Sequence, residues 1–239
     1  KKMNSQHRQD RQPEEQKAIL IPVLGIPIQD YLIFIGVFLM LTFVNFVMRD
    51  LFHSFSYTMI LSIQEGRTTQ NWVTFFQTLS QLSSNYAVYT ILMLIYVFGS
   101  RALAIYYAFI ISAFLYLMTL MQLCMRYPRP FQLHSEIHAV ECSYQYGDPC
   151  STALRITALV LSLYLDFVYD KLRRISKITF ALWTIALLIL VVGVSIARLF
   201  LAANTISQIF YGIALGILIA IFMHFSVKDA FYGHLKKLQ

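Results

Sequence analysis

Three arginines in two short stretches of an apolar chain are the residues best suited to hold a ligand. Arg126 and Arg129 lie in RYPRP, and Arg198 lies in ARLFLAAN. A guanidinium group is planar and can donate two parallel hydrogen bonds to one phosphate. We therefore expect Arg126, Arg129 and Arg198 to bind a phosphate or lipid headgroup. The alternative is that Arg129 and Arg198 pair internally with one of three acidic residues, Glu136, Glu141 or Asp148.

The polar side chains that accompany these arginines are poorly suited to acid–base or nucleophilic chemistry. They are Gln122, Thr152, Asn204 and Gln208. The lone pair of a carboxamide nitrogen is delocalised, so Asn204 is not a usable nucleophile. A hydroxyl group such as that of Thr152 is not an efficient general acid near neutral pH. The pattern predicts a site that can bind an anion but lacks reacting groups.

These stretches, with YGDPCSTA at 146–153, resemble the signature of the type 2 phosphatidic acid phosphatase superfamily. The closest resemblance is to lipid phosphatases that act on sphingosine-1-phosphate and related long-chain phosphates. That family reads K-x6-R-P, then Y-G-x-P-S-T-H-A, then S-R-x5-H-x3-D/Q. The resemblance extends from about residue 100 to about residue 225. It implies an all-α fold, a six-helix transmembrane bundle whose site lies at one membrane face.

The resemblance also implies a role for each matched position. In active relatives the lysine and arginines neutralise phosphate oxygens, one histidine attacks phosphorus, and the other protonates the leaving alcohol. Here Gln122 replaces the lysine, Thr152 the proton donor and Asn204 the nucleophile, while Gln208 keeps the position that orients the nucleophile. Losing one member of such a unit can cost on the order of 10⁶ in turnover. We therefore expect a pseudoenzyme with no intact catalytic residue and no cofactor.

Three functions are compatible with a site of this kind. The first is a non-catalytic accessory subunit of a larger membrane complex, bound to membrane phospholipids and to other membrane protein subunits. The second is an active lipid phosphate phosphatase with atypical residues, and the third is a protein that binds or moves lipids. For the accessory subunit we expect the mitochondrial inner membrane, whereas the family resemblance favours the endoplasmic reticulum.

The composition is that of a multi-pass membrane protein. Hydrophobic residues make up 58% of the chain and charged residues 13%, against about 25% charged residues in soluble domains. A polar tail, residues 1–18, precedes one membrane-embedded domain, residues 19–239. Segment 51–63 is too short to cross and is expected to lie at the interface or re-enter. The six predicted spans are 31–48, 85–99, 102–122, 153–169, 175–196 and 205–225, of which the second could extend back to Trp72.

The positive charges indicate the orientation of these spans. With six crossings, 13 of the 19 Lys and Arg residues fall on the side that holds both termini, as the positive-inside rule requires. The net charge of +7 is thereby explained, and no basic soluble face remains that would indicate nucleic-acid binding. All motif positions fall on the opposite side.

Two features of the predicted spans bear on packing. Arg155, early in the fourth span, is expected to extend toward the membrane surface. Gly212 and Gly216 form a G-x3-G pair in the last span, which permits close contact with a helix of the same bundle.

The loop between the third and fourth spans contains possible metal ligands. His134, His138, Cys142 and Cys150 are spaced H-x3-H-x3-C-x7-C, and all four are zinc-ligand types. Cys142 and Cys150 could instead form a disulfide in an oxidising compartment. The remaining alternative is a polar loop with neither feature, and no metal is expected.

Overall fold

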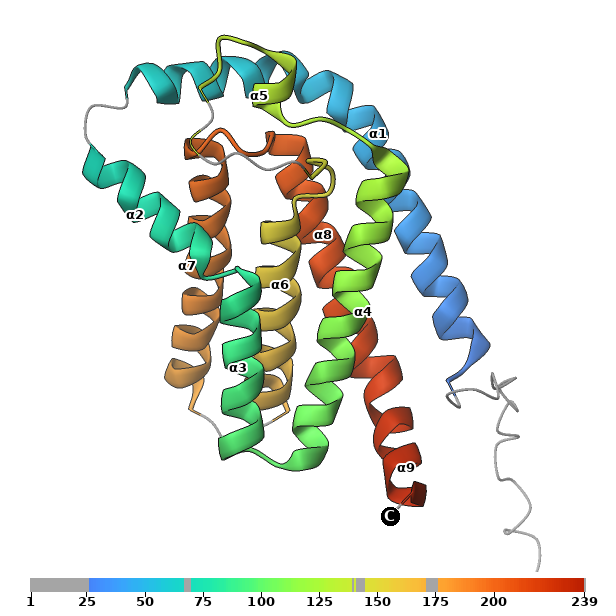
Figure 1. Cartoon of the computed structure of the whole chain (residues 1–239). Coiled ribbons are helices and arrows are strands. Elements are labelled where there is room, and N and C mark those ends of the chain that lie inside the picture. The colour runs from blue at the N-terminus through green and yellow to red at the C-terminus, as the bar shows by residue number, and fades with distance from the viewer. Residues whose placement is uncertain (1–25, 67–69, 139, 141–144, 171–175, 239) are drawn as a thin grey trace, which may run out of the picture.

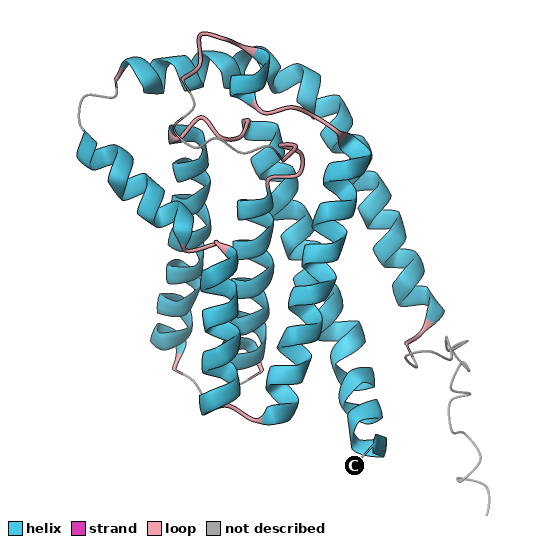
Figure 2. Cartoon of the chain, in the orientation of Figure 1, coloured by secondary structure: helices cyan, strands magenta, loops and turns pink. Residues whose placement is uncertain are grey.

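The computed structural model describes residues 26–66, 70–138, 140, 145–170 and 176–238. The regular elements of these residues are helices (Figure 2). They are α1 (Ile28–Glu65), α2 (Gln70–Gln81), α3 (Asn85–Phe98), α4 (Arg101–Met125), α5 (Pro130–Leu133), α6 (Ser151–Tyr164), α7 (Lys177–Phe200), α8 (Ile206–Phe222) and α9 (Lys228–Leu238). Two π-helical turns, Leu165–Tyr169 and Met223–Val227, extend α6 and join α8 to α9.

The long helices form an up-and-down bundle (Figure 1). Five helical segments of the described residues are long and apolar enough to cross a membrane, and the bent pair α2–α3 makes a sixth. The predicted all-α, six-helix membrane bundle is therefore confirmed. The beginning of α1, the α3–α4 connection and the C-terminus lie at one end of the bundle (Figure 1), which is the arrangement that the charge distribution predicts.

Segment 51–63 is continuous with the first span, and its place at the membrane interface stays a prediction. It is the second half of α1, which runs without a break for 38 residues. No glycine or proline interrupts the sequence between Val37 and Glu65, so nothing ends the helix after the first span. The second half of α1 curves across the end of the bundle, close to α5 (Figure 1).

The second crossing is broken where the sequence becomes polar. Helices α2 and α3 meet at an angle of 47° around the residues Leu82, Ser83 and Ser84. Ser84 caps α3, because its Oγ accepts a hydrogen bond from the backbone N–H of Ala87 at 3.3 Å. Serine is a preferred N-cap residue, so the run of serines both ends α2 and begins α3. Trp72 belongs to α2.

The G-x3-G pair packs α8 against α6 inside the bundle. A Cβ added at Gly212 would lie 2.7 Å from the carbonyl oxygen of Cys150, and one at Gly216 would lie 2.8 Å from Cβ of Thr157. Both distances are too short for a side chain, so the glycines permit the two backbones to approach closely. The resulting contact aligns the beginning of α8 with the beginning of α6, where two of the motif stretches lie.

A charged cluster joins α6, α8 and α9 at the other end of the bundle. The Asp166 carboxylate lies 2.8 Å from His224 Nδ1 and 2.9 Å from Lys228 Nζ, and it accepts a hydrogen bond from the Tyr107 hydroxyl at 2.8 Å. Asp170 contacts the same His224 and Lys228. Among the described residues, Asp166, Asp170 and His224 are the group whose ligand atoms are close enough to share a metal ion. Lys228 lies against both carboxylates and supplies a cation from the chain itself.

Candidate functional site

The three motif stretches meet at the end of the bundle that is opposite the beginning of α1 and the end of α9 (Figure 1). The first follows α4, the second leads into α6, and the third connects α7 to α8. Backbone hydrogen bonds join them directly: the N–H of Gly147 donates to Tyr127 O at 2.9 Å, and the N–H of Cys150 donates to Gln208 O at 3.1 Å. The convergence expected from the order of the spans is thus present in the fold.

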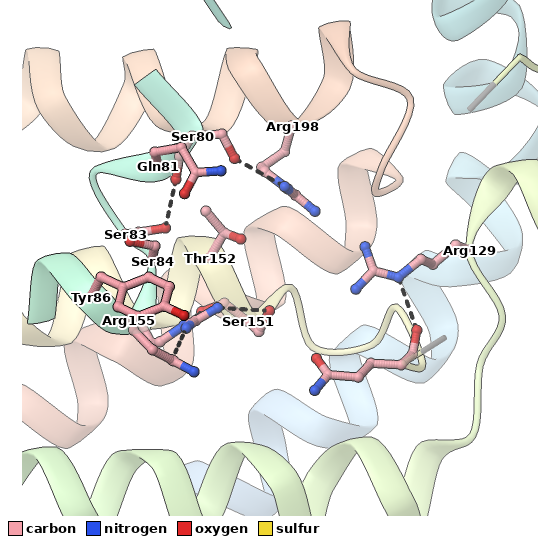
Figure 3. Close-up of a pocket in the computed structure, with 12 residues that line it drawn as sticks. Ser80, Gln81, Ser83, Ser84, Tyr86, Arg129, Ser151, Thr152, Arg155 and Arg198 are labelled. Atoms are coloured by element: carbon pink, nitrogen blue, oxygen red, sulfur yellow. Dashed lines mark hydrogen bonds between the residues drawn. The ribbon is translucent and has the colours of Figure 1, made fainter. Parts of the chain in front are cut away.

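A polar cavity of about 360 Å³ opens beside these stretches. Ligand sites commonly enclose about 300–1,000 Å³, so the cavity can hold a headgroup. Figure 3 shows the guanidinium groups of Arg129 and Arg198 directed into it. Its lining residues come from the α2–α3 break, the motif loops and the first turns of α6, and they are Ser80, Gln81, Ser83, Ser84, Asn85, Tyr86, Arg129, Gln145, Ser151, Thr152, Arg155 and Arg198.

Arg129 and Arg198 are buried arginines held by the motif loops. Arg129 Nε donates to Gln145 O at 2.9 Å, and its Nη1 donates to Ala203 O at 3.1 Å. Arg198 Nη1 donates to Ser80 Oγ at 3.0 Å. The structure therefore brings together two of the three arginines expected to bind a headgroup.

The structure does not bring Arg126 together with the other two arginines. Arg126 ends α4 in the left-handed conformation, with φ of 47°. Its side chain is exposed, and its Nε donates to the nearby carbonyl of Leu123. Arg126 is absent from the cavity lining, so it is outside the candidate site.

Asn204 occupies the position at which the resembled family has its nucleophilic histidine, and its amide is fully hydrogen-bonded. Its Oδ1 accepts from Arg198 Nε at 3.2 Å. Its Nδ2 donates to Gly147 O at 2.9 Å and to Gln208 Oε1 at 3.1 Å. These contacts use the two N–H groups and the oxygen of the side chain. Asn204 is 1% exposed and does not line the cavity.

Gln208 and Gln122 complete a set of amides that hold the motif stretches together. Gln208 Nε2 donates to Pro128 O at 3.1 Å, and its Oε1 accepts from the N–H of Thr205 at 3.0 Å. Gln122 Nε2 lies 3.2 Å from two carbonyl oxygens, those of Tyr146 and Pro149. Both glutamines are buried and lie outside the cavity lining. The side-chain amides of Gln122 and Gln208 thus donate hydrogen bonds to backbone carbonyl groups of the motif stretches.

Thr152 lines the cavity, whereas Gln122, Asn204 and Gln208 do not. It lies in the first turn of α6 and is 5% exposed. Figure 3 shows it between Arg198 and the α2–α3 break. Its hydroxyl can donate a hydrogen bond to an anion but has no histidine beside it at Asn204 to complete a reacting pair.

Two of the three acidic residues considered as internal partners face other parts of the chain. Asp148 Oδ2 accepts a hydrogen bond from Asn45 Nδ2 of α1 at 2.8 Å, and Glu136 accepts one from the hydroxyl of Tyr57. Glu141 is outside the described residues. Asp148 is 1% exposed, and its Oδ1 has no hydrogen-bond partner among the described residues. Burial raises the pKa of this carboxyl above its ordinary value of 3.8, and the Asn45 hydrogen bond opposes that rise.

The predicted metal ligands are not grouped in the part of the chain that the structure describes. The His134 ring packs against Tyr57, with ring centroids 4.2 Å apart, and the N–H of His138 donates to Gln64 Oε1. Cys150 is a buried free cysteine at the beginning of α6. Cys142 lies outside the described residues, so neither the four-residue zinc set nor the Cys142–Cys150 disulfide is tested.

One wall of the cavity and one arginine of its lining were not predicted from the sequence. The wall is the polar run at the α2–α3 break, and its signal in the sequence is SQLSSNY at 80–86, an interruption between two apolar helices. The arginine is Arg155, which we expected to extend toward the membrane surface but which lines the cavity. Its signal is its position three residues after Thr152, which places both side chains on one helix face.

The comparisons with known proteins agree with this geometry. A family model described as PAP2 superfamily matches residues 101–232. The crystal structure of the first transmembrane PAP2 type phosphatidylglycerolphosphate phosphatase from Bacillus subtilis is similar in fold, with a TM-score of 0.64 and 11% sequence identity. The similarity covers 84% of this chain and 97% of that one. A search of curated protein sequences finds no match to this chain.

The fold and the paired arginines define a polytopic protein built like a membrane lipid phosphatase. The chain belongs to the PAP2 superfamily, the type 2 phosphatidic acid phosphatases. The particular closeness to sphingosine-1-phosphate phosphatases remains a prediction from the motif residues.

Proposed function

We propose that this protein binds a phosphate-bearing lipid headgroup in the arginine-lined cavity and does not hydrolyse it. The supporting observation is the state of Asn204. Its carboxamide stands at the nucleophile position, is buried, and is fully hydrogen-bonded to Arg198, Gly147 and Gln208. The lone pair of this amide nitrogen is delocalised and its hydrogen bonds hold it in place, so it cannot attack phosphorus.

The remaining residues of the site favour binding over turnover. Arg129 and Arg198 are directed into the cavity (Figure 3), where each guanidinium can donate to phosphate oxygens. A hydrolytic cycle would also require a proton donor for the leaving alcohol. Thr152 is the residue at that position, and a hydroxyl is a poor donor near neutral pH. The site therefore keeps arginines that can bind phosphate but lacks the nucleophile and the proton donor that hydrolysis requires.

A phosphate-release assay tests the absence of turnover. Purified protein in detergent micelles would be given phosphatidic acid or a long-chain base phosphate, with Arg198→Ala as the matched control. We expect wild type and control to release phosphate at the same background rate. Release by wild type above the Arg198→Ala rate would show an active phosphatase with atypical residues, and the proposal would be overturned.

We further propose that the protein is an accessory subunit of a larger membrane assembly. The surface of α1 supports this idea, because only 6% of its most apolar stretch is buried inside the bundle, against 61% for the spans of α6 and α8. Such a helix has a long apolar surface available to other membrane subunits as well as to phospholipids. We propose the mitochondrial inner membrane as the compartment, and the endoplasmic reticulum remains the alternative that the family favours.

Native purification in a mild detergent tests the accessory role. We expect the protein to migrate with other chains in a particle much larger than its own 27.7 kDa. Fractionation of organelles from the same cells would distinguish the two compartments. A protein that migrates as a monomer in all mild detergents would contradict the subunit proposal without affecting the binding proposal.

A further inference from the structure

A groove with apolar walls lies between α6 and α7, toward the end of the bundle that is opposite the arginine-lined cavity. It encloses about 530 Å³. Its lining residues come from α6, the π-helical turn after it and α7, and they are Val160, Leu163, Tyr164, Phe167, Val168, Trp183, Ala186, Leu187 and Leu190. In Figure 1 these parts of α6 and α7 lie toward the end that holds the beginning of α1 and the end of α9. The groove shares no lining residue with the arginine-lined cavity, so it is a separate feature of the fold.

The groove is open to the lipid that surrounds the bundle. Only 17% of the most apolar stretch of α7 is buried inside the bundle, and Trp183 and Ala186 of this helix are exposed at the groove. Ala186 has the smallest side chain of the lining, so it leaves space between larger neighbours. Helices pack to the density of organic crystals, and an apolar space between them loses dispersion contacts unless an apolar group fills it. In a bilayer the group at hand is a lipid acyl chain.

The dimensions of the groove favour one acyl chain over a helix of another protein. From Val160 to Val168 the backbone rises by about 12 Å, at about 1.5 Å per residue. One leaflet contributes about 15 Å of hydrocarbon, half of a core of about 30 Å, so the groove has the depth of a leaflet. A helix with its side chains is at least about 10 Å wide and would occupy about 900 Å³ over that length, which is more than the groove encloses. The hydrogen bond between the Tyr164 hydroxyl and Thr184 Oγ1, at 2.8 Å, joins the two walls.

The chain is basic at the end of the groove where the headgroup of such a lipid would lie. Lys177 begins α7 and is exposed. The stretch KLRRI at 171–175, which is outside the described residues, adds three basic residues to the sequence just before it. Asp170, at the end of the other wall, is within 2.5 Å of Lys228 Nζ and contacts His224, so its negative charge is paired. Basic residues at a membrane surface attract anionic lipids.

We propose that the α6–α7 groove binds one acyl chain of an anionic phospholipid from the leaflet at this end of the bundle, with Lys177 at the level of the lipid headgroup. The chain fills the space beside Ala186 and so supports the packing of α6 against α7. This site lies at the membrane face opposite the arginine-lined cavity, and it does not depend on the proposed function.

Quenching of tryptophan fluorescence by brominated lipids tests this site. The chain has two tryptophans, and Trp72→Phe, at an exposed position of α2, leaves Trp183 at the groove as the reporter. The full chain would be placed in vesicles that mix phosphatidylglycerol with phosphatidylcholine, with bromine on the acyl chains of one lipid at a time. We expect phosphatidylglycerol to be preferred at Trp183 by about fivefold, the scale of one basic residue near a membrane surface. Its quenching should therefore saturate at a low fraction of that lipid.

Two pairs of variants in the Trp72→Phe background assign the preference to the groove. Ala186→Leu fills the groove and should abolish the preference, whereas Ala181→Leu, at an exposed position of α7 outside the lining, should leave it unchanged. Lys177→Gln should lower the preference, and Lys236→Gln, at an exposed position of α9, should retain it.

Three results would overturn the proposal. The first is equal quenching of Trp183 by the two lipids. The second is a preference that Ala186→Leu leaves unchanged or that Lys177→Gln does not lower. The third is the absence of quenching by either lipid, which would show that a protein segment covers the groove. The comparison of the two lipids in the Trp72→Phe protein decides the question even if a further variant does not fold.

Discussion

Asn204 Nδ2 lies 2.9 Å from the carbonyl oxygen of Gly147 and donates a hydrogen bond to it. This contact joins the α7–α8 turn to the loop before α6, two stretches that supply opposite halves of the site. A Cβ added at Gly147 would lie 2.6 Å from Gln208 Nε2, so a side chain there would displace the Gln208 amide. Asn204 stands at the family's catalytic position, and here its side chain connects two loops.

Replacing Asn204 by alanine should destabilise the fold. Asn204→Ala leaves the buried Gly147 carbonyl and one group on each of Arg198 and Gln208 without this partner, which is worth about 1–3 kcal/mol. Thermal unfolding in detergent measures the change. Asn71→Ala, at an exposed position of α2, is the matched control and should change stability by less than about 0.5 kcal/mol. Equal melting temperatures for the two variants would refute the connecting role of Asn204.

The close contact between α6 and α8 predicts opposite effects for two glycine substitutions. Gly216→Ala would place Cβ 2.8 Å from Thr157 Cβ and 2.9 Å from Leu154 O, and overpacking of this kind costs about 1–3 kcal/mol. Gly36→Ala in α1 meets nothing within 4 Å and should be neutral or stabilising by up to about 1 kcal/mol. The two melting temperatures measured side by side provide the test. A Gly216→Ala protein as stable as Gly36→Ala would show that α6 and α8 do not pack as described.

Asp148 predicts a dependence of stability on pH. Burial raises the pKa of its carboxyl in the folded protein, so the folded state binds this proton more tightly than the unfolded state. Between the unfolded pKa, near 3.8, and the higher folded pKa, stability contributed by this group falls as pH rises. Asp148→Asn removes this loss. The variant should therefore exceed wild type in melting temperature at neutral pH and match it most closely near pH 3.8.

The control for that measurement is Asp50→Asn. The Asp50 side chain is 75% exposed beside Arg49, so its substitution should change stability by less than about 0.5 kcal/mol. A gain for Asp148→Asn that is as large at pH 3.8 as at neutral pH would exclude ionisation of Asp148 as its cause.

The charged cluster at the other end of the bundle should be a main source of stability for α9. Asp166→Ala removes one of the two carboxylates that contact the buried His224 and the half-buried Lys228, so the cost should be smaller than the about 3–5 kcal/mol of breaking a fully buried pair. Limited proteolysis after Tyr232 and thermal unfolding would both report the loss. Asp229→Ala, at an exposed position of the same helix, should resist proteolysis as wild type does. Identical digestion of the two variants would contradict a stabilising role for the cluster.

The sequence predicts the motif residues of the site better than the cavity wall at the α2–α3 break. Arg129, Arg198, Thr152 and Asn204 could be placed at one membrane face because each lies at the end of an apolar span, and span order alternates the faces. Arg126 was expected to join them, but the left-handed turn at this residue directs its side chain outward. Local backbone geometry of this kind is invisible in a hydropathy pattern.

The residues that were missed come from the broken crossing. A 47° bend between α2 and α3 brings Ser80 within hydrogen-bond distance of Arg198, 118 positions away in the sequence. The polar run SQLSSNY signals a break, but the direction of the bend depends on packing against α7. The continuity of α1 through 51–63 was missed for a related reason, because a helix can continue past the length that a bilayer requires.

The central claim is that the cavity binds a phosphate-bearing lipid headgroup without hydrolysing it. The ³¹P NMR spectrum of a short-chain phosphatidic acid, followed over time with the full chain in nanodiscs, tests both parts in one sample. We predict that the lipid resonance shifts or broadens when wild-type protein is added, that this change is lost with Arg198→Ala, and that no inorganic phosphate resonance grows. An inorganic phosphate signal that increases with wild type and not with Arg198→Ala, or a lipid resonance that wild type leaves unchanged, would contradict the claim.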